Sequence, residues 1–138
     1  MLVREIMTRK METVAPSATL REAAQKMRVR DLGSLPVMED GKLIGMITDR
    51  DICCRGVADG FDPVRTEVQE IMSRDVLFCF GDDTVTDAVR QMEKGHIRRL
   101  AVLNRDKSVA GFLSVDDLAH YSRQLAGEVL DTLRPTHH

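Results

Sequence analysis

The stretch Gly45–Ile52, GMITDRDI, returns 66 positions later as Gly111–Leu118, GFLSVDDL. Each copy has a glycine, two apolar residues, a hydroxyl residue, two further residues, an aspartate and an aliphatic residue. Self-similarity at a long, fixed spacing is typical of chains built from repeated supersecondary units. The sequence of 138 residues is therefore predicted to contain two copies of one small unit.

The duplication extends toward the N-terminus from both copies. Val3–Thr8, VREIMT, returns 65 positions later as Val68–Ser73, VQEIMS. Both copies then keep the i, i+3, i+4, i+7 apolar face of an amphipathic helix, in Leu20, Ala23, Ala24 and Met27 and in Val85, Ala88, Val89 and Met92. The change of offset from 65 to 66 places one extra residue in the turn at 104–108, because turns tolerate insertions.

Each copy predicts the same order of elements after a short helical turn at VREIMT or VQEIMS. We expect an extended segment, a helix and two strands, at residues 11–15, 18–30, 34–38 and 43–47 in the first copy and 76–80, 84–94, 99–103 and 109–113 in the second. A second helix then starts inside the quoted stretch. The first helices begin with capping-box patterns, Thr19-x-x-Glu22 and Thr84-x-x-Asp87. After Leu118 one amphipathic helix is expected to continue, with Leu118, Tyr121, Leu125 and Val129 on one side.

These elements predict an α+β fold of two β-α-β-β-α units. Each small sheet would leave one face bare, so the units are expected to pack through their sheets with pseudo-two-fold symmetry and two matched clefts at the seam. The predicted boundaries are 1–60 and 68–122 for the repeats, 61–67 for a linker, and 123–138 for a helix end and a tail. The last five residues, RPTHH, are expected to fray.

Composition and charge narrow the class of protein. Hydrophobic residues make up 43% and charged residues 30% of the chain, as in ordinary globular proteins. A net charge of -2 and a pI near 6.1 give no broad basic surface for nucleic acid. No long apolar run or secretory leader is visible, so we expect neither a membrane span nor export, and a cytoplasmic location.

The sequence gives no pattern of a catalytic or metal site. No Ser-His-Asp set, P-loop or ligand-spaced His and Cys cluster is present, and the neighbours Asp116 and Asp117 fit the first turn of a helix. We therefore expect no enzyme activity, no bound metal and no required cofactor. Cys53, Cys54 and Cys79 form no CxxC motif and are expected to be small buried hydrophobic residues, with a redox role of the Cys53–Cys54 pair as the alternative.

The repeated hydroxyl and acid allow two interpretations. Thr48 and Ser114 lie where a strand passes into a helix, so each can cap that helix together with the aspartate three residues on. Alternatively, the free N–H groups and the hydroxyl bind a phosphate, while Asp51 and Asp117 accept from the two hydroxyls of a ribose. Gly45 lets another group approach the backbone closely, as does its counterpart in the second copy.

These residues resemble a tandem pair of CBS domains, the module named after cystathionine beta-synthase, in a stand-alone bacterial type also called a Bateman module. The resemblance covers about residues 3–120 and is carried by the IMT and IMS starts, TVAPSATLREAAQKM, LGSLPV and the doubled Gly-x-x-Thr/Ser-x-x-Asp pattern, with MITDRDI typical of small bacterial members. The resemblance implies ligand clefts between the repeats, a homodimer in the form of a flat disc, and adenosine-containing ligands: AMP, ADP, ATP, and NADH or S-adenosylmethionine in some members.

The resemblance also implies roles for residues of this chain. Asp51 and Asp117 are expected to hold ribose, and Thr48 and Ser114 phosphate. The adenine pocket is expected at Thr13, Val14, Ala15, Pro16, Leu35, Pro36, Phe78, Cys79, Phe80, Leu100 and Ala101. The second copy has Ala101 where the first has Pro36, and VLFCFGDD where the first has METVAPSA, so the two clefts are expected to be unequally occupied.

A basic cluster, His96-Ile97-Arg98-Arg99, has no counterpart in the first copy, which reads Asp31-Leu32-Gly33-Ser34. Alternation along a strand sends Arg98 and Arg99 to opposite faces, so at least one is expected to point into the seam. Arginine beside a helix start favours a di- or triphosphate. His96, Arg98, Arg99 and Arg50 are therefore further phosphate candidates, with solvated surface charges as the alternative.

Together these features predict a regulatory or sensor module. An adenosine nucleotide bound between the repeats would change their packing, and an unidentified partner protein would respond to that change. The alternative is a ligand-independent interaction or stress-response scaffold whose clefts are vestigial.

Overall fold

A computed structural model describes residues 1–133, which form two compact units. The central unit is the continuous stretch 12–76, and the terminal unit combines residues 1–11 with the chain from Leu77 onward. The tail that was expected to fray, RPTHH, lies outside the described residues. No helix in residues 1–133 has the length and apolar character needed to cross a bilayer.

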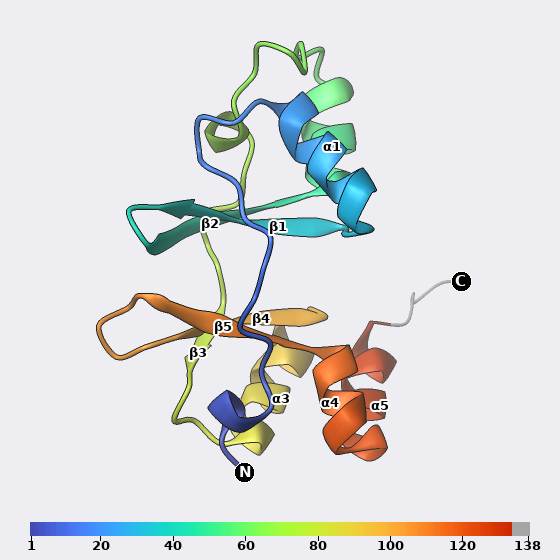
Figure 1. Cartoon of the computed structure of the whole chain (residues 1–138). Helices are drawn as coiled ribbons and strands as arrows, with labels where there is room; N and C mark the ends of the chain where they lie inside the picture. Colours follow the sequence, from blue (N-terminus) through green and yellow to red (C-terminus); the bar gives the residue numbers. More distant parts are fainter. Residues whose placement is uncertain (134–138) are drawn as a thin grey trace. The chain divides into compact units, whose positions relative to one another are not determined.

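The central unit is a β-hairpin covered by helical segments (Figure 1). Strands β1 and β2 pair in antiparallel fashion, with Leu35 opposite Ile47. The Thr19 hydroxyl accepts a hydrogen bond from the Glu22 backbone N–H at 3.1 Å, which confirms the predicted cap of the first helix. The elements are α1 (Leu20–Arg30), β1 (Ser34–Glu39), β2 (Lys42–Thr48), α2 (Asp49–Asp51), the π-helical segment η2 (Ile52–Val57) and the 3-10 turn η3 (Val68–Glu70).

The extended segment expected at 11–15 is reduced to one parallel bridge between Val14 and Val37. Val14 donates its N–H to the carbonyl of Pro36 at 3.0 Å and accepts from the N–H of Met38 at 2.9 Å. The next ladder bonds on either side would need N–H groups of Pro16 and Pro36, which proline lacks. The first β element of this repeat is therefore limited to a single bridge, and the two prolines explain why.

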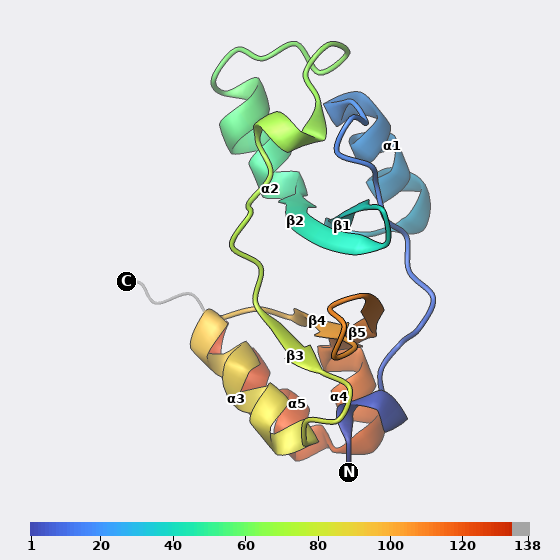
Figure 2. The same cartoon turned by 90° about the vertical axis from the view of Figure 1, so that its left-hand side faces the viewer.

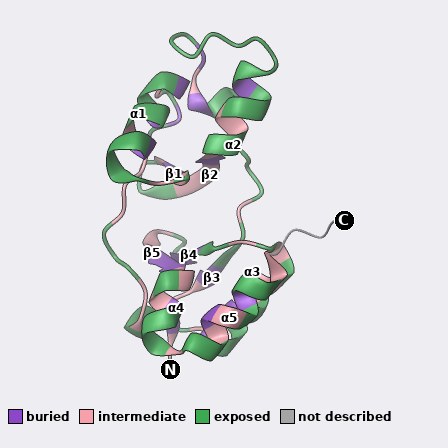
Figure 3. Cartoon of the chain, turned by 90° about the vertical axis from the view of Figure 1, so that its right-hand side faces the viewer, coloured by how far each residue is buried: buried purple, intermediate pink, exposed green. Residues whose placement is uncertain are grey.

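The terminal unit has a three-stranded sheet in the order β3-β4-β5, with β3 parallel and β5 antiparallel to β4. Its helices cover one face of that sheet (Figures 1 and 2). The buried residues of α3 and α5 form a core with the sheet, whereas their outer sides are exposed (Figure 3). The elements are η1 (Val3–Glu5), β3 (Phe78–Phe80), α3 (Val85–Gly95), β4 (Arg99–Leu103), β5 (Val109–Ser114), α4 (Val115–Tyr121) and α5 (Arg123–Thr132).

The helix expected to continue after Leu118 is broken at Ser122. This residue has an extended backbone (φ -158°, ψ 114°), and its hydroxyl accepts from the N–H of Leu125 at 3.3 Å. Ser122 thus ends α4 and caps α5, since serine competes for backbone donors in this way. Leu118 and Val129 are fully buried as expected, but Tyr121 is 44% exposed, so the prediction of one continuous apolar side was wrong.

The leading segment of each repeat packs with the strands of the other repeat. Val3 lies in the core of the terminal unit, whereas Val68, Ile71 and Met72 lie in the core of the central unit. Thr8 bridges Phe112, and the matching residue of the second copy, Ser73, bridges Met46. The repeats of the sequence and the compact units of the structure therefore have different boundaries, and the pseudo-two-fold packing of the units stays a prediction.

The cysteines differ from one another in exposure. Cys79 is 1% exposed in the core of the terminal unit, while Cys53 and Cys54 are exposed. Both exposed residues lie on η2, in which only Gly56 is buried. The expectation of burial was therefore wrong for Cys53 and Cys54.

Candidate functional site

Both hydroxyl-and-acid pairs form reciprocal caps at the ends of β2 and β5. The Thr48 hydroxyl accepts from the Asp51 N–H at 3.0 Å, and the Asp51 Oδ2 accepts from the Thr48 N–H at 3.0 Å. Ser114 and Asp117 make the same two bonds, each of 3.0 Å. The capping interpretation is confirmed at both places. We call each arrangement a hydroxyl–acid box, and each box keeps one carboxylate oxygen, Oδ1, outside the cap.

The two boxes differ in what that outer oxygen contacts. In the terminal unit, Asp117 Oδ1 accepts a hydrogen bond from the Thr8 hydroxyl at 2.9 Å. In the central unit, Asp51 Oδ1 lies 3.9 Å from Nη1 of Arg55, which is a long ion pair with a half-exposed arginine. A neutral hydroxyl is easier for another hydroxyl to replace, because no charge is left unpaired in the exchange. The terminal box is therefore chemically suited to accept from a polyol.

The repeated glycines leave room for the chain's own backbone. A Cβ at Gly111 would lie 2.5 Å from the carbonyl oxygen of Thr8, and one at Gly45 would lie 2.8 Å from that of Ser73. Real Cβ atoms do not approach so closely, so a side chain at either position would displace the bridging segment. The predicted close approach is confirmed, and the approaching group is the IMT or IMS segment itself.

The basic cluster lies beside the terminal box. The N–H of Val115, the first residue of α4, donates to the carbonyl of Arg98 at 3.0 Å, and Arg99 is the strand partner of Ser114. Both arginine side chains are exposed. In the central unit, Gly33 accepts the equivalent bond from Asp49 at 2.9 Å. Two arginines therefore adjoin the terminal box where the central unit has Gly33 and Ser34, while the central box has Arg50 and Arg55 on its own helical segment.

The other two phosphate candidates lie in different settings. His96 has a left-handed backbone (φ 52°) at the end of α3, and its Nδ1 lies 3.0 Å from the carbonyl oxygen of Thr132. One ring nitrogen of His96 is thus engaged by the last residue of α5. Arg50 is exposed on α2, between Thr48 and Asp51 of the capped turn in the central unit.

The residues predicted to contact adenine fall into two groups. Leu35, Leu100 and Cys79 are buried in the cores, so contact with a base would have to use their backbone atoms. Burial, followed by the nearby Asp83 carboxylate, raises the pKa of the Cys79 thiol to about 12. The remaining residues of the predicted adenine pocket differ in exposure. The buried ones are Val14, Pro16, Pro36 and Ala101, the half-buried ones are Thr13 and Phe80, and the exposed ones are Ala15 and Phe78.

Phe78 and Phe80 form an edge-to-face pair with ring centroids 5.6 Å apart. Alternation along β3 places them on the side opposite to Cys79, which faces the helices. The ring of Phe80 is also covered by the guanidinium of Arg105, 4.0 Å from the ring centroid. An aromatic surface is thus available at Phe78, and one side of Phe80 is already occupied.

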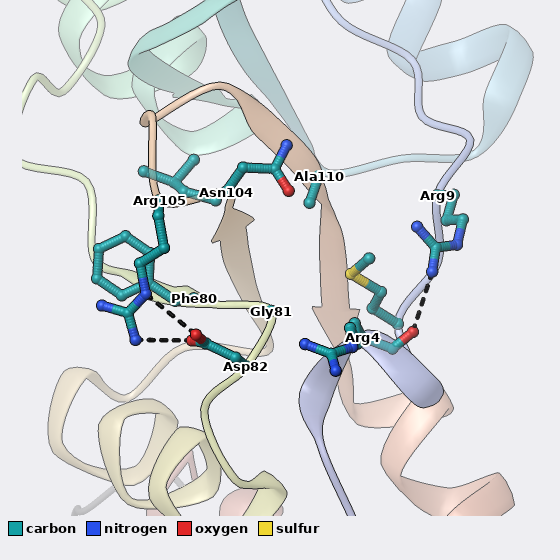
Figure 4. A pocket seen from close by; sticks show the side chains of 10 residues that line it. Arg4, Arg9, Phe80, Gly81, Asp82, Asn104, Arg105 and Ala110 are labelled. Atoms are coloured by element: carbon teal, nitrogen blue, oxygen red, sulfur yellow. Dashed lines mark hydrogen bonds and ion pairs between the residues drawn. The ribbon is translucent and has the colours of Figure 1, made fainter.

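The described part of the terminal unit has at least two cavities. One, of about 320 Å³, is lined by Asp117 together with Ile6, His120 and Tyr121. The other, of about 160 Å³, is lined by three arginines and was not predicted from the sequence (Figure 4). The signal that could have indicated it is the turn at 104–106, where Asn-Arg-Asp replaces Glu-Asp-Gly of the first copy. Within residues 1–133 no group of three His, Cys, Asp or Glu side chains is placed to hold a metal ion.

Comparison with known proteins places these features in a family. The family model described as CBS domain matches residues 3–55 and 68–124. The CBS domain-containing protein YhcV of Bacillus subtilis is 37% identical over 133 residues, covering 95% of this chain and 94% of that protein. Hypoxic Response Protein I, solved with two coordinated zinc ions, is 32% identical with a TM-score of 0.79, covering 88% of this chain and 98% of that one.

A third match is a solved structure with adenosine compounds. The CBS domain pair of protein MJ0100, in complex with 5'-methylthioadenosine and S-adenosyl-L-methionine, is 26% identical with a TM-score of 0.74. The match covers 88% of this chain and 98% of that one.

Proposed function

Since the chain belongs to the CBS domain family, whose model matches both of its repeats, we propose that it is a regulatory module that binds an adenosine-containing ligand and passes the change to a partner protein. The observation that carries the proposal is the terminal hydroxyl–acid box, where Asp117 Oδ1 holds a replaceable hydroxyl next to Arg98 and Arg99. The adenosine compounds bound by the MJ0100 domain pair support this choice of ligand.

In this proposal the terminal box binds the ribose and phosphate of a nucleotide. The Thr8 hydroxyl lies 2.9 Å from Asp117 Oδ1. A vicinal hydroxyl of the ribose takes its place at that oxygen. The Ser114 hydroxyl accepts from a backbone N–H in the cap and still has its own hydrogen to donate to a phosphate oxygen. Arg98 and Arg99 supply positive charge for that phosphate.

The central box has different charges and is proposed to prefer a different ligand. Gly33 and Ser34 stand where the terminal unit has Arg98 and Arg99, and Arg50 is the phosphate candidate that remains there. An adenosine compound without phosphate, such as S-adenosylmethionine or methylthioadenosine, therefore suits the central box better than AMP, ADP, ATP or NADH. Unequal ligands in the two boxes follow from this difference in charge.

The proposal is tested by isothermal titration with AMP, ATP, NADH and S-adenosylmethionine. Asp117→Asn keeps an oxygen for the cap but removes the charge that accepts from ribose. We expect AMP affinity to fall by at least about tenfold, since a hydrogen bond to a charged group is worth about 1.5–3 kcal/mol. Asp116→Asn, an exposed neighbour on the same helix, is the matched control and should leave affinity unchanged.

Equal effects of the two substitutions would show that net charge, rather than the box, controls binding. Asp51→Asn gives the same test for the central unit and should affect S-adenosylmethionine rather than AMP. A dimer in solution, as the resemblance implies, is checked on the same samples by light scattering.

A second candidate function is a scaffold that binds no nucleotide. The observation that favours it is that both outer carboxylate oxygens already have partners, Thr8 at Asp117 and Arg55 at Asp51. A ligand at about 100 times its dissociation constant adds about 2.7 kcal/mol of stability to the native protein. Melting curves that do not move with any of the adenosine compounds would therefore favour the scaffold.

A further inference from the structure

The second cavity of the terminal unit gathers basic side chains from separate segments of the chain. Arg4 and Arg9 approach from the N-terminal segment, and Arg105 approaches from the β4–β5 turn on the other side (Figure 4). Ala110, which lines the cavity, precedes Ser114 on β5 by four residues, or about 13 Å at a rise of about 3.3 Å per residue. The cavity therefore contains neither Ser114 nor Asp117, and its lining meets the hydroxyl–acid box only through Met7 and Arg9, which flank Thr8.

Arg105 is held in a fixed orientation. Its Nη2 and Nε donate to the two carboxylate oxygens of Asp82 at 2.7 and 3.2 Å, and its guanidinium stacks on the Phe80 ring. The hydrogen bond from Arg105 is the largest effect that lowers the pKa of Asp82, and Arg4 contributes a smaller charge effect. A guanidinium has five donors, so Arg105 keeps three for another acceptor.

The other two arginines form no short ion pair in the described chain, although the charge of Arg4 acts on Asp82 at longer range. Arg9 donates from Nη2 to the backbone carbonyl of Arg4 at 3.3 Å, which uses one of its donors. Neither Arg4 nor Arg9 forms an ion pair with a carboxylate of residues 1–133. The lining thus carries three guanidinium groups against the single carboxylate of Asp82.

The corresponding place in the central unit lacks this charge. The 65-residue offset pairs Arg4 with Gln69 and Arg105 with Asp40, while Arg9 keeps an arginine, Arg74. The aromatic ring and the carboxylate that hold Arg105 also have no counterpart there, since Ala15 and Ser17 stand in place of Phe80 and Asp82. The duplicated fold therefore does not require the arginines, and they distinguish the terminal unit from the central one.

We propose that this cavity is an anion site that binds one phosphate group. Guanidinium groups donate paired, charge-assisted hydrogen bonds that match phosphate oxygens. A volume of about 160 Å³ is well below the roughly 300 Å³ at which pockets hold drug-sized ligands, so a phosphate fits and a whole nucleotide does not. The phosphate comes from inorganic phosphate or from a small phosphorylated molecule whose remainder stays in solvent.

The test uses titration of the full chain with inorganic phosphate, followed by amide NMR and by calorimetry. We expect one saturable site per chain below about 10 mM, with shifts at the Gly81 and Ala110 amides. Arg4→Gln, which introduces the residue of the central unit, and Arg105→Gln should each weaken binding by about fivefold or more. Arg74→Gln in the central unit is the matched control and should leave binding unchanged.

The other outcomes overturn the inference. Phosphate that fails to saturate, or that binds Arg4→Gln as well as the unmodified chain, shows that the cavity holds no anion. Equal weakening by Arg74→Gln shows a general effect of net charge. A melting curve of each variant confirms that it is folded before its affinity is read.

A separate arm distinguishes this site from the proposed nucleotide site. Phosphate should bind with the same affinity when AMP is present at saturation, and glycerol 3-phosphate should compete with phosphate. Competition between AMP and phosphate would overturn the assignment of a separate site. If AMP does not bind at all, the nucleotide proposal fails. The phosphate titration of the unmodified chain and of Arg4→Gln then still decides the anion site by itself.

Discussion

Gly111→Ala tests whether the N-terminal segment completes the terminal sheet as described. The added Cβ would lie 2.5 Å from the Thr8 carbonyl oxygen and 3.1 Å from Sδ of Met7. The methionine can move, but the carbonyl belongs to the backbone that pairs with Phe112. We therefore expect the substitution to push Thr8 away from β5.

The size of the effect follows from the bonds that are lost. Thr8 and Phe112 exchange two backbone hydrogen bonds of 2.8 Å each, and Thr8 also donates to Asp117. At about 1 kcal/mol per bond, their loss costs about 3 kcal/mol. Alanine also stabilises the protein by about 0.4–1 kcal/mol, because it restricts the unfolded chain. The free energy of unfolding should therefore fall by about 2 kcal/mol. For a chain of this size the melting temperature should fall by roughly 8 °C.

The assay is thermal unfolding combined with amide hydrogen exchange at Phe112. Gly127→Ala is the control, because Gly127 lies on α5 with no atom within 4 Å of an added Cβ. That change should raise the melting temperature by roughly 2–4 °C, since alanine favours helix. A Gly111→Ala protein that melts at or above the original temperature, with an equally protected Phe112 amide, would refute the placement of the segment.

Four further predictions follow from individual side chains. Thr8→Val frees the outer carboxylate oxygen of the terminal box, so AMP should bind about fivefold more tightly by calorimetry; unchanged affinity would contradict the role given to that oxygen. A thiol reagent at pH 8 should modify Cys53 and Cys54 quickly and Cys79 only on unfolding, because the Cys79 pKa is about 12 in the folded chain and 9.0 in the unfolded one. For the same reason stability should fall as pH rises above 9.0, where only the unfolded thiol ionises, and substitution of Cys79 by Ala should remove that part of the slope in denaturant titrations. Ser122→Ala removes the cap of α5 and should cost about 1 kcal/mol in the same titrations, whereas a change near zero would mean that the hydroxyl does not cap.

Local patterns predicted the elements of this fold well. The capping pair Thr84 and Asp87 starts α3 as expected, with a hydrogen bond of 3.2 Å. The strands expected at 99–103 and 109–113 are β4 and all but the last residue of β5. These features depend on residues close together in the sequence, so their periodicity and caps are sufficient.

The features that sequence reasoning missed depend on distant residues. VREIMT and VQEIMS are nearly identical, so the sequence does not say which glycine-containing strand each will pair with. The lost strand at Val14 required knowing that Pro36 is its neighbour in space. The arginine cavity combines Arg4 with Arg105, and the link between them appears only when the N-terminal segment is seen to pack beside β3.

The chain passes between its two units twice, after Met11 and again after Val76. A gene fragment that stops at residue 60 would encode the central hairpin without Val68, Ile71 and Met72, and so would expose an apolar face that invites aggregation. Cutting at the compact boundary avoids this, because 12–76 holds all of its own core. The complementary piece from Leu77 onward would lack Val3, a fully buried core residue that residues 1–11 supply to the terminal unit.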